Sequence, residues 1–111
     1  MEPNVSRRAA EWWADRLCAT HAKKRAAFVT ACVVAFDDEI ARAKGRDVTL
    51  GYIDYDPEGP LLAATRAAGI ECRAEGVFRV QKSGIQVRDG HLEAKEGYGA
   101  AWLPMPSPVS P

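Results

Sequence analysis

The longest hydrophobic pattern in the chain is helical and lies in its N-terminal part. Residues 6–44 contain no glycine or proline before Gly45 and are rich in alanine, arginine and lysine, which are good helix formers. Apolar side chains recur there at spacings of three and four, as on one helix face: Val29, Cys32, Val33, Phe36 and Ile40. A single helix of this length would measure about 57 Å, which exceeds a compact domain of this size. The pattern therefore predicts two helices, or one sharply bent helix, with the break near Thr20 and His21 and the end before Gly45.

The middle of the chain predicts a strand, a short helix and a second strand. Residues 48–55 are apolar on both faces, as in an interior strand. Asp56 suits the helix N-cap, Pro57 the first helical position and Gly69 the left-handed C-cap. Residues 70–81 then alternate between apolar and polar side chains, which is typical of a strand with one buried face. A strand–helix–strand crossover places its two strands in parallel.

A β-hairpin with a defined register is predicted after this unit. Asp89-Gly90 is a favoured pair for a two-residue type I′ turn. The turn fixes the order of the pairs across it, and these pairs alternate between apolar and polar: Val87 with Leu92, Ile85 with Ala94, Arg88 with His91, and Gln86 with Glu93. Turn chemistry and hydrophobic pattern thus agree on one register.

Together these elements predict an α+β fold. Two N-terminal helices, or one bent helix, precede a β-α-β-β-β unit that forms a small mixed sheet with helices on one face. Residues 1–103 are expected to form one domain, since a chain of 111 residues can build one hydrophobic core but not two. Residues 104–111 are expected to be a proline-rich flexible tail, because proline cannot continue a helix or a central strand.

The charge balance argues against a strong global attraction to nucleic acid or anionic lipid. Lysine and arginine total 15, as do aspartate and glutamate. No apolar run approaches the roughly 20 residues of a membrane span, and the N-terminus lacks the apolar core of a signal peptide. Cys18, Cys32 and Cys72 have no disulfide-framework spacing, which is typical of reduced thiols. We therefore expect a cytoplasmic protein without membrane contact.

Asp54, Asp56 and Glu58 are the first candidates for a ligand site. With Gly59 they look like the start of a calcium loop, but Thr65 stands where that loop needs a glutamate, and a strand precedes them instead of a helix. Helix capping is the simpler interpretation of Asp56. A ligand site of another kind stays open, because α/β sheets commonly bind ligands at the carboxyl ends of parallel strands.

Metal and catalytic chemistry find little support in the sequence. Cys18, His21, Cys72 and His91 could together supply four zinc ligands, but they lack the close CxxC pairs of structural zinc sites. A catalytic cysteine needs a partly exposed electropositive niche, whereas two of the three cysteines fall on apolar faces. The sequence contains no Gly-rich phosphate loop, GxSxG or HExxH motif. We therefore expect no cofactor, no bound metal and no enzymatic activity.

The N-terminal helices carry two features that favour contacts with macromolecules. Lys24 and Arg25 belong to a locally basic segment that could contact phosphates, although acidic residues are interspersed. Trp12 and Trp13 point about 100° apart on a helix, so both rings cannot lie at the centre of one narrow apolar stripe. Tryptophan is enriched at interface hot spots, which suggests a protein partner or a homodimer. A wide core that covers both rings is the alternative.

The segment GYIDYDPEGPLLAATRAAGIECR, followed at a distance by KEGYGA, resembles a pattern in small uncharacterised proteins of proteobacterial phages and prophages. The resemblance covers residues 50–73 and 96–100 and carries no catalytic residue with it. It implies a protein that acts inside a bacterium by binding a host protein complex. With the residue patterns, it predicts a non-enzymatic protein-binding module, such as an inhibitor of a host defence complex of the anti-CRISPR kind. The predicted contact residues are Trp12, Trp13, Lys24 and Arg25.

Two alternatives remain open at this point. One is a nucleic-acid-binding accessory protein that uses the basic N-terminal helices. The other is a binder of a small ligand or metal at the acidic residues Asp54, Asp56 and Glu58.

Overall fold

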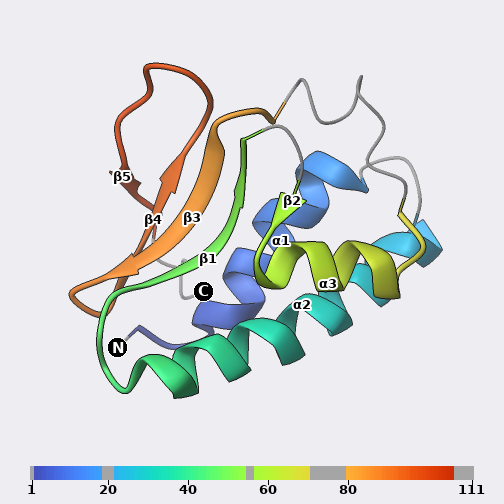
Figure 1. Ribbon diagram of the computed structural model, residues 1–111, viewed down its shortest axis with the longest axis horizontal. Coiled ribbons are helices and arrows are strands. Elements are labelled where there is room, and N and C mark those ends of the chain that lie inside the picture. The colour runs from blue at the N-terminus through green and yellow to red at the C-terminus, as the bar shows by residue number, and fades with distance from the viewer. Residues whose placement is uncertain (1, 19–21, 55–56, 71–79, 107–111) are drawn as a thin grey trace.

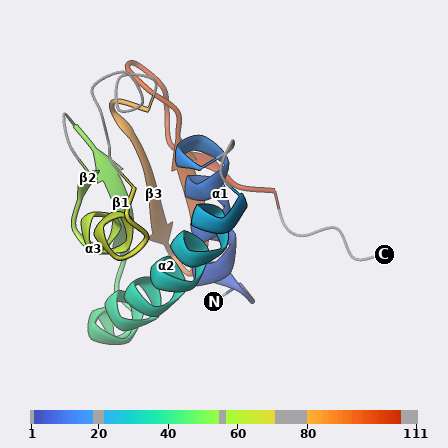
Figure 2. The ribbon, with the colours of Figure 1, turned by 90° about the vertical axis from the view of Figure 1, so that its right-hand side faces the viewer.

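The computed structural model describes residues 2–18, 22–54, 57–70 and 80–106. These residues form two layers, with an antiparallel sheet on one side and helices on the other (Figures 1 and 2). Within that part of the chain the elements are α1 (Val5–Leu17), α2 (Ala22–Ala43), β1 (Val48–Ile53), β2 (Pro57–Glu58), α3 (Pro60–Ala67), β3 (Ser83–Arg88), β4 (His91–Lys95) and β5 (Leu103–Pro104). The predicted α+β class is confirmed.

The sheet has the strand order β2-β1-β3-β4-β5, and all its pairings between described strands are antiparallel. No pair of described strands is parallel, so the predicted mixed sheet is not found in the part of the chain that the structure describes. β1 pairs with β3 of the hairpin, and not with a strand over residues 70–81. Residue 70 is outside any strand and residues 80–82 form a turn, while 71–79 lie outside the described residues. An alternating pattern predicts a half-buried strand, but it does not choose the strand's neighbour or direction.

The predicted hairpin is confirmed in every pair. β3 and β4 place Val87 opposite Leu92 and Ile85 opposite Ala94. Asp89 and Gly90 have φ angles of 51° and 79°, so both central residues adopt the left-handed conformation that a type I′ turn requires.

The N-terminal segment forms two helices, which confirms the first of the two predicted alternatives. α1 ends at Leu17 and α2 begins at Ala22, so the chain changes direction in the predicted region; Thr20 and His21 themselves lie outside the described residues. α2 ends before Gly45, as predicted, and α2 packs against both α1 and α3. None of the helices in the described ranges is both long enough and apolar enough to cross a membrane.

The short helix α3 starts later than the sequence suggested. Pro57 belongs to β2 and pairs with Ile53, so it is not the first helical residue. Asp56, the predicted N-cap, lies outside the described residues. Gly59 precedes the helix with a φ of 62°, and Pro60 takes the first helical position, where its missing N–H costs no hydrogen bond. Pro60 therefore occupies the first helical position that was predicted for Pro57.

The end of α3 matches the prediction. Gly69 has a φ of 65°, and its N–H donates to the carbonyl of Arg66 at 3.1 Å. The N–H of Ile70 donates to the carbonyl of Thr65 at 2.9 Å. These two bonds form a Schellman motif, which satisfies the last carbonyls of the helix.

The core between the layers has Trp13 at its centre. Its side chain is fully buried, and the indole Nε1 donates to the carbonyl of Leu50 at 2.9 Å. β1 changes register between Thr49 and Tyr52, and Gly51 in this bulge has a φ of 101°. A Cβ on Gly51 would lie 2.7 Å from Nε1 of Trp13, so the glycine lets the strand approach the ring. Other large side chains with no exposed surface belong to the same core cluster: Phe28, Phe36, Leu50, Ile53, Leu61, Ile85 and Leu92.

Candidate functional site

A cleft of about 510 Å³ lies between α1 and the segment that runs from β4 through β5. Trp12 lines it from α1, and the opposite side is mainly apolar: Ala94, Ala101, Leu103, Pro104 and Met105. We call this the Trp12 cleft. Leu103 is 63% exposed, which makes it one of the most exposed large apolar side chains in the described residues.

The ring of Trp12 is half-buried and held from two sides. Its centroid lies 4.9 Å from that of Trp13, and the two rings are nearly perpendicular. The guanidinium of Arg16 lies 3.5 Å from the centroid of Trp12, which is a cation–π contact. Arg16 also donates to the carbonyl of Trp12 at 2.8 Å and forms an ion pair with Glu96 of the opposite wall. Trp12 is therefore fixed in position before any partner arrives.

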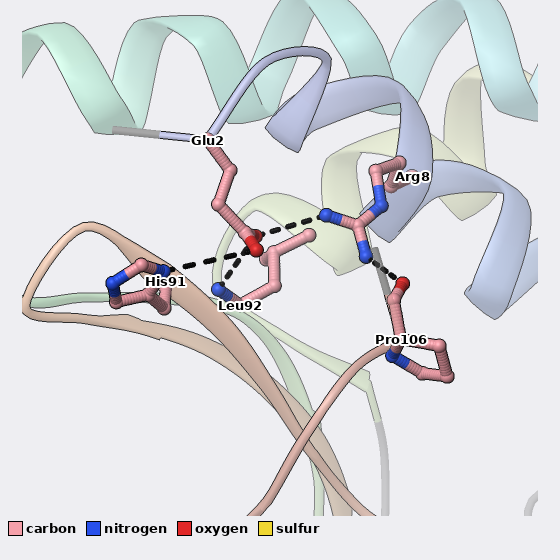
Figure 3. A network of polar contacts seen from close by, with 5 residues as sticks. All are labelled: Glu2, Arg8, His91, Leu92 and Pro106. Atoms are coloured by element: carbon pink, nitrogen blue, oxygen red, sulfur yellow. Dashed lines mark hydrogen bonds and ion pairs between the residues drawn. The ribbon is translucent and has the colours of Figure 1, made fainter. Parts of the chain in front are cut away.

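A second polar network holds Pro106, which is another residue of the cleft lining (Figure 3). Arg8 of α1 forms an ion pair with Glu2 at 2.9 Å and donates to the carbonyl of Pro106. The same carboxylate accepts the N–H of Leu92 at 3.1 Å, and Nδ1 of His91 lies 3.8 Å from its other oxygen. Figure 3 shows these groups converging from the N-terminus, α1, the start of β4 and the C-terminal segment. The network therefore fixes the C-terminal wall of the Trp12 cleft.

Residues 104–106 are thus attached to the domain, whereas the sequence predicted a flexible tail from residue 104. Pro104 pairs with Glu93, and the N–H of Met105 donates to the carbonyl of Leu92 at 3.0 Å. β5 is the last strand in the sheet order, and an edge strand tolerates a proline because one side of its backbone has no strand neighbour. Residues 107–111 of the predicted tail lie outside the described residues.

Glu2 is a charged group with little exposed surface. Burial raises the pKa of its carboxyl, but the hydrogen bond from Leu92 and the charge of Arg8 outweigh burial and hold that pKa below its ordinary value. The ionised carboxylate is therefore the form that stabilises the network. Because the folded pKa is the lower one, this stabilisation is present above the unfolded pKa and is lost as the pH falls through the folded pKa.

Glu2→Gln is expected to lower the free energy of unfolding at neutral pH by about 1–2 kcal/mol, because the amide keeps an acceptor for Leu92 but loses the charge that Arg8 faces. Urea unfolding in steps from neutral pH to about pH 3 measures this loss, and the difference from wild type should shrink at the acidic end. Glu11→Gln is the matched control, since Glu11 forms an exposed pair with Arg7 and should cost below about 0.5 kcal/mol. A difference for Glu2→Gln that stays constant with pH would contradict the assignment.

The structure separates the four predicted contact residues. Trp12 lines the cleft, whereas Trp13 is enclosed in the core and cannot offer its ring to a partner without leaving it. Arg25 of α2 forms an ion pair with Asp15 of α1 at 2.6 Å, and Lys24 is exposed on α2, outside the cleft lining. The expectation that the two tryptophans differ in exposure is met, and Trp12 is the more exposed one.

The basic character of the N-terminal helices is largely neutralised. Four arginines of α1 and α2 form ion pairs with carboxylates: Arg7 with Glu11, Arg8 with Glu2, Arg16 with Glu96, and Arg25 with Asp15. A cation that already has a carboxylate partner contributes less to binding phosphate, because the existing pair must be broken or shared. The geometry therefore does not favour these helices as a nucleic-acid surface.

The two described acidic residues after β1, Asp54 and Glu58, do not line one common cleft. Asp54 forms an ion pair with Lys82, and this hydrogen bond raises the pKa of Lys82. Glu58 is exposed and lines a different cleft of about 500 Å³ with Tyr52 and Trp102, while Asp56 lies outside the described residues. The argument from parallel strands also fails, because this sheet is antiparallel. Among the described residues, no three His, Cys, Asp or Glu side chains are grouped to hold a metal ion.

Cys32 is a poor candidate for a nucleophile. Its thiol is fully buried, and burial, with a smaller effect from the neighbouring Cys18, raises its pKa to about 12. Little reactive thiolate exists at neutral pH under these conditions. Of the four residues in the zinc hypothesis, Cys18 is buried, Cys72 and His21 lie outside the described residues, and His91 is exposed beside Glu2.

Sequence reasoning missed most of the cleft. Arg16 follows Trp12 by four positions on a helix, and that spacing could have indicated the cation–π contact. Glu96 is 80 positions from Arg16, and Pro106 is 98 positions from Arg8. No local sequence pattern predicts contacts between residues so far apart.

Comparison with protein-family models, with curated proteins and with solved structures finds no match for this chain, so the function is inferred from the geometry of the molecule.

Proposed function

We propose that the chain is a non-enzymatic protein-binding module and that the Trp12 cleft is its contact surface. The observation that carries this proposal is the position of Trp12. A half-buried tryptophan, held by Arg16 and facing an apolar cleft, has the properties of an interface hot spot. Because Trp12 is already fixed, a partner does not have to spend binding free energy on ordering the ring.

The cleft favours a partner that inserts an apolar side chain. Apart from Trp12 and Glu96, its lining consists of alanine, leucine, methionine and proline residues. The two ion-paired arginines lie outside the lining and contact it, Arg16 at Glu96 and Arg8 at Pro106. Strand addition at β5 is a poorer mode, because that strand has two residues and Pro104 lacks an N–H to donate. We therefore propose an anchor residue on a helix or loop of the partner protein.

The narrower proposal, a phage-type modulator of a bacterial host complex, rests on the sequence resemblance alone. For this proposal, a bacterial lysate is the source in which a partner should be sought. The Trp12 cleft is the surface proposed to bind such a complex.

The test compares variants on and off the cleft. The immobilised chain captures its partner from a bacterial lysate, and the affinity of the purified partner is then measured for each variant. Trp12→Ala and Leu103→Asp are each expected to weaken binding by about thirtyfold or more, as at hot spots. Thr49→Asp is the matched control, because Thr49 is exposed on β1 and outside the cleft lining.

Circular dichroism and thermal unfolding of each variant serve as the control for correct folding. Leu103→Asp is the more decisive variant, since Leu103 is well exposed and its replacement removes little packing. A partner that binds wild type, Trp12→Ala and Leu103→Asp equally well would refute the assigned surface. Capture of no specific protein would refute the proposed function itself.

A further inference from the structure

The exposed face of α2 forms a second apolar surface, away from the Trp12 cleft. A shallow groove of about 690 Å³ runs between α2 and α3. Val34 lies on this face and is 68% exposed. It therefore contributes little to the hydrophobic core of its own domain. Ala63 and Ala67 of α3 form the far wall, and six residues of α2 form the near wall: Ala26, Ala27, Thr30, Ala31, Val34 and Ala35.

These six positions are symmetric about the midpoint between Thr30 and Ala31. A second α2 that runs antiparallel, with a two-fold axis at this midpoint, places Ala26 opposite Ala35 and Ala27 opposite Val34. Thr30 then faces Ala31. The small side chains would let the two helix axes approach closely, while each Val34 fills the space over an alanine of the other copy.

The charges on α2 follow the same symmetry. Lys23 and Lys24 precede the apolar positions, and Asp37 and Asp38 follow them. The antiparallel arrangement that pairs Ala27 with Val34 also pairs Lys23 with Asp38. It places Lys24 opposite Asp37, whose carboxylate already accepts a hydrogen bond from Ser6 of α1 at 2.5 Å, so Lys23 and Asp38 are the main charge pair. Opposite charges therefore meet at both ends of the helix pair, and the two helix dipoles run in opposite directions. A parallel arrangement would instead bring lysine to lysine and aspartate to aspartate.

Burial of this face would cost few hydrogen bonds. The hydroxyl of Thr30 already donates to the carbonyl of Ala26 at 3.0 Å, so it needs no water. Asp38 forms an ion pair with Arg42 at 3.0 Å, but both side chains are more than half exposed. The carboxylate of Asp38 therefore keeps a free side for a lysine of a second copy.

We propose that α2 pairs antiparallel with α2 of a second copy of this chain and thereby forms a symmetric homodimer. This interface is distinct from the Trp12 cleft, which is built from α1, β4 and β5. A dimer through α2 would carry two copies of the cleft. The proposed dimer therefore does not depend on the proposed function of the Trp12 cleft, and each can be tested without the other.

Sedimentation equilibrium over micromolar to millimolar concentrations tests the dimer. Wild type is expected to associate in a concentration-dependent manner. Lys23→Glu and Asp38→Lys should each weaken dimerisation about tenfold at low salt, because each change places like charges opposite one another at both ends. The double variant with both changes restores opposite charges and should recover the wild-type affinity. Ala27→Glu places a charge opposite Val34, within the apolar part of the interface, and should weaken dimerisation by more than either reversal.

The control exchanges an exposed pair on another helix. Arg7 and Glu11 form an ion pair on α1, and the double variant with Arg7→Glu and Glu11→Arg should dimerise like wild type. All of these changes are at exposed helical positions, so the variants are expected to fold. A chain that stays monomeric up to about millimolar concentration overturns the proposal. A dimer that tolerates Ala27→Glu, or one that the double charge exchange fails to restore, overturns it as well.

Discussion

Replacement of Trp13 by alanine is expected to lower the free energy of unfolding by about 3–5 kcal/mol, the largest effect of any single change proposed for this protein. Trp13 has no exposed surface, and its truncation leaves a cavity between the layers. The change also removes the donor to the carbonyl of Leu50, which stays buried without that partner. Because small domains are stable by only about 5–15 kcal/mol, this variant should be close to unfolded.

Chemical denaturation followed by far-UV circular dichroism measures this loss. Trp13→Phe keeps most of the volume and removes the N–H, so it should cost about 1–3 kcal/mol and remain measurable if the alanine variant does not fold. Trp12→Ala is the internal comparison, since the neighbouring ring is only half-buried. A Trp13→Ala variant as stable as Trp12→Ala would show that Trp13 is not at the centre of the core.

Gly51→Ala is expected to cost about 2–4 kcal/mol, for two reasons that can be separated. The φ of 101° is unfavourable for any residue with a Cβ, and that Cβ would lie 2.7 Å from Nε1 of Trp13. Gly69→Ala supplies the control, because Gly69 also has a positive φ, 65°, but has no atom within 4 Å of the added carbon. Gly69→Ala should therefore cost only the strain, about 1 kcal/mol.

A double-mutant cycle isolates the contact between Gly51 and the ring. Phenylalanine at position 13 lacks the indole nitrogen Nε1, the atom that the new Cβ would approach most closely, at 2.7 Å. Gly51→Ala should consequently cost less in the Trp13→Phe background than in wild type, with a coupling of about 1 kcal/mol. Additive losses would show that backbone strain alone accounts for the effect of Gly51→Ala.

The parts of the fold that the sequence could predict are those in which local chemistry is decisive. Asp89-Gly90 fixes the hairpin register, because a type I′ turn leaves only one set of facing residues. Gly69 ends α3 as expected, since few other residues adopt the left-handed conformation there at low cost. The division into α1 and α2 followed from the limit that a compact domain places on helix length.

The parts that the sequence could not predict depend on distant partners. The direction of β1 relative to its neighbour is set by β3, about thirty positions later, and the pattern of β1 is equally compatible with either direction. Pro57 and Pro60 both suit a helix start, and only the pairing of Pro57 with Ile53 decides between them. The sequence also could not show which of the two tryptophans is buried. The ring of Trp13 fits in the core because the bulge at Gly51, a distant residue, leaves space for it.

The two arginine contacts that frame the Trp12 cleft also determine when the cleft can exist. Arg8 and Arg16 bind groups 98 and 80 positions away, so each contact closes most of the chain into a loop. While the chain is being synthesised, α1 can form early, but its cleft has no second wall until residue 106 has left the ribosome. The proposed contact surface is thus completed only after residues 94–106 have been synthesised, whereas the buried core residues of the described chain end at Leu92.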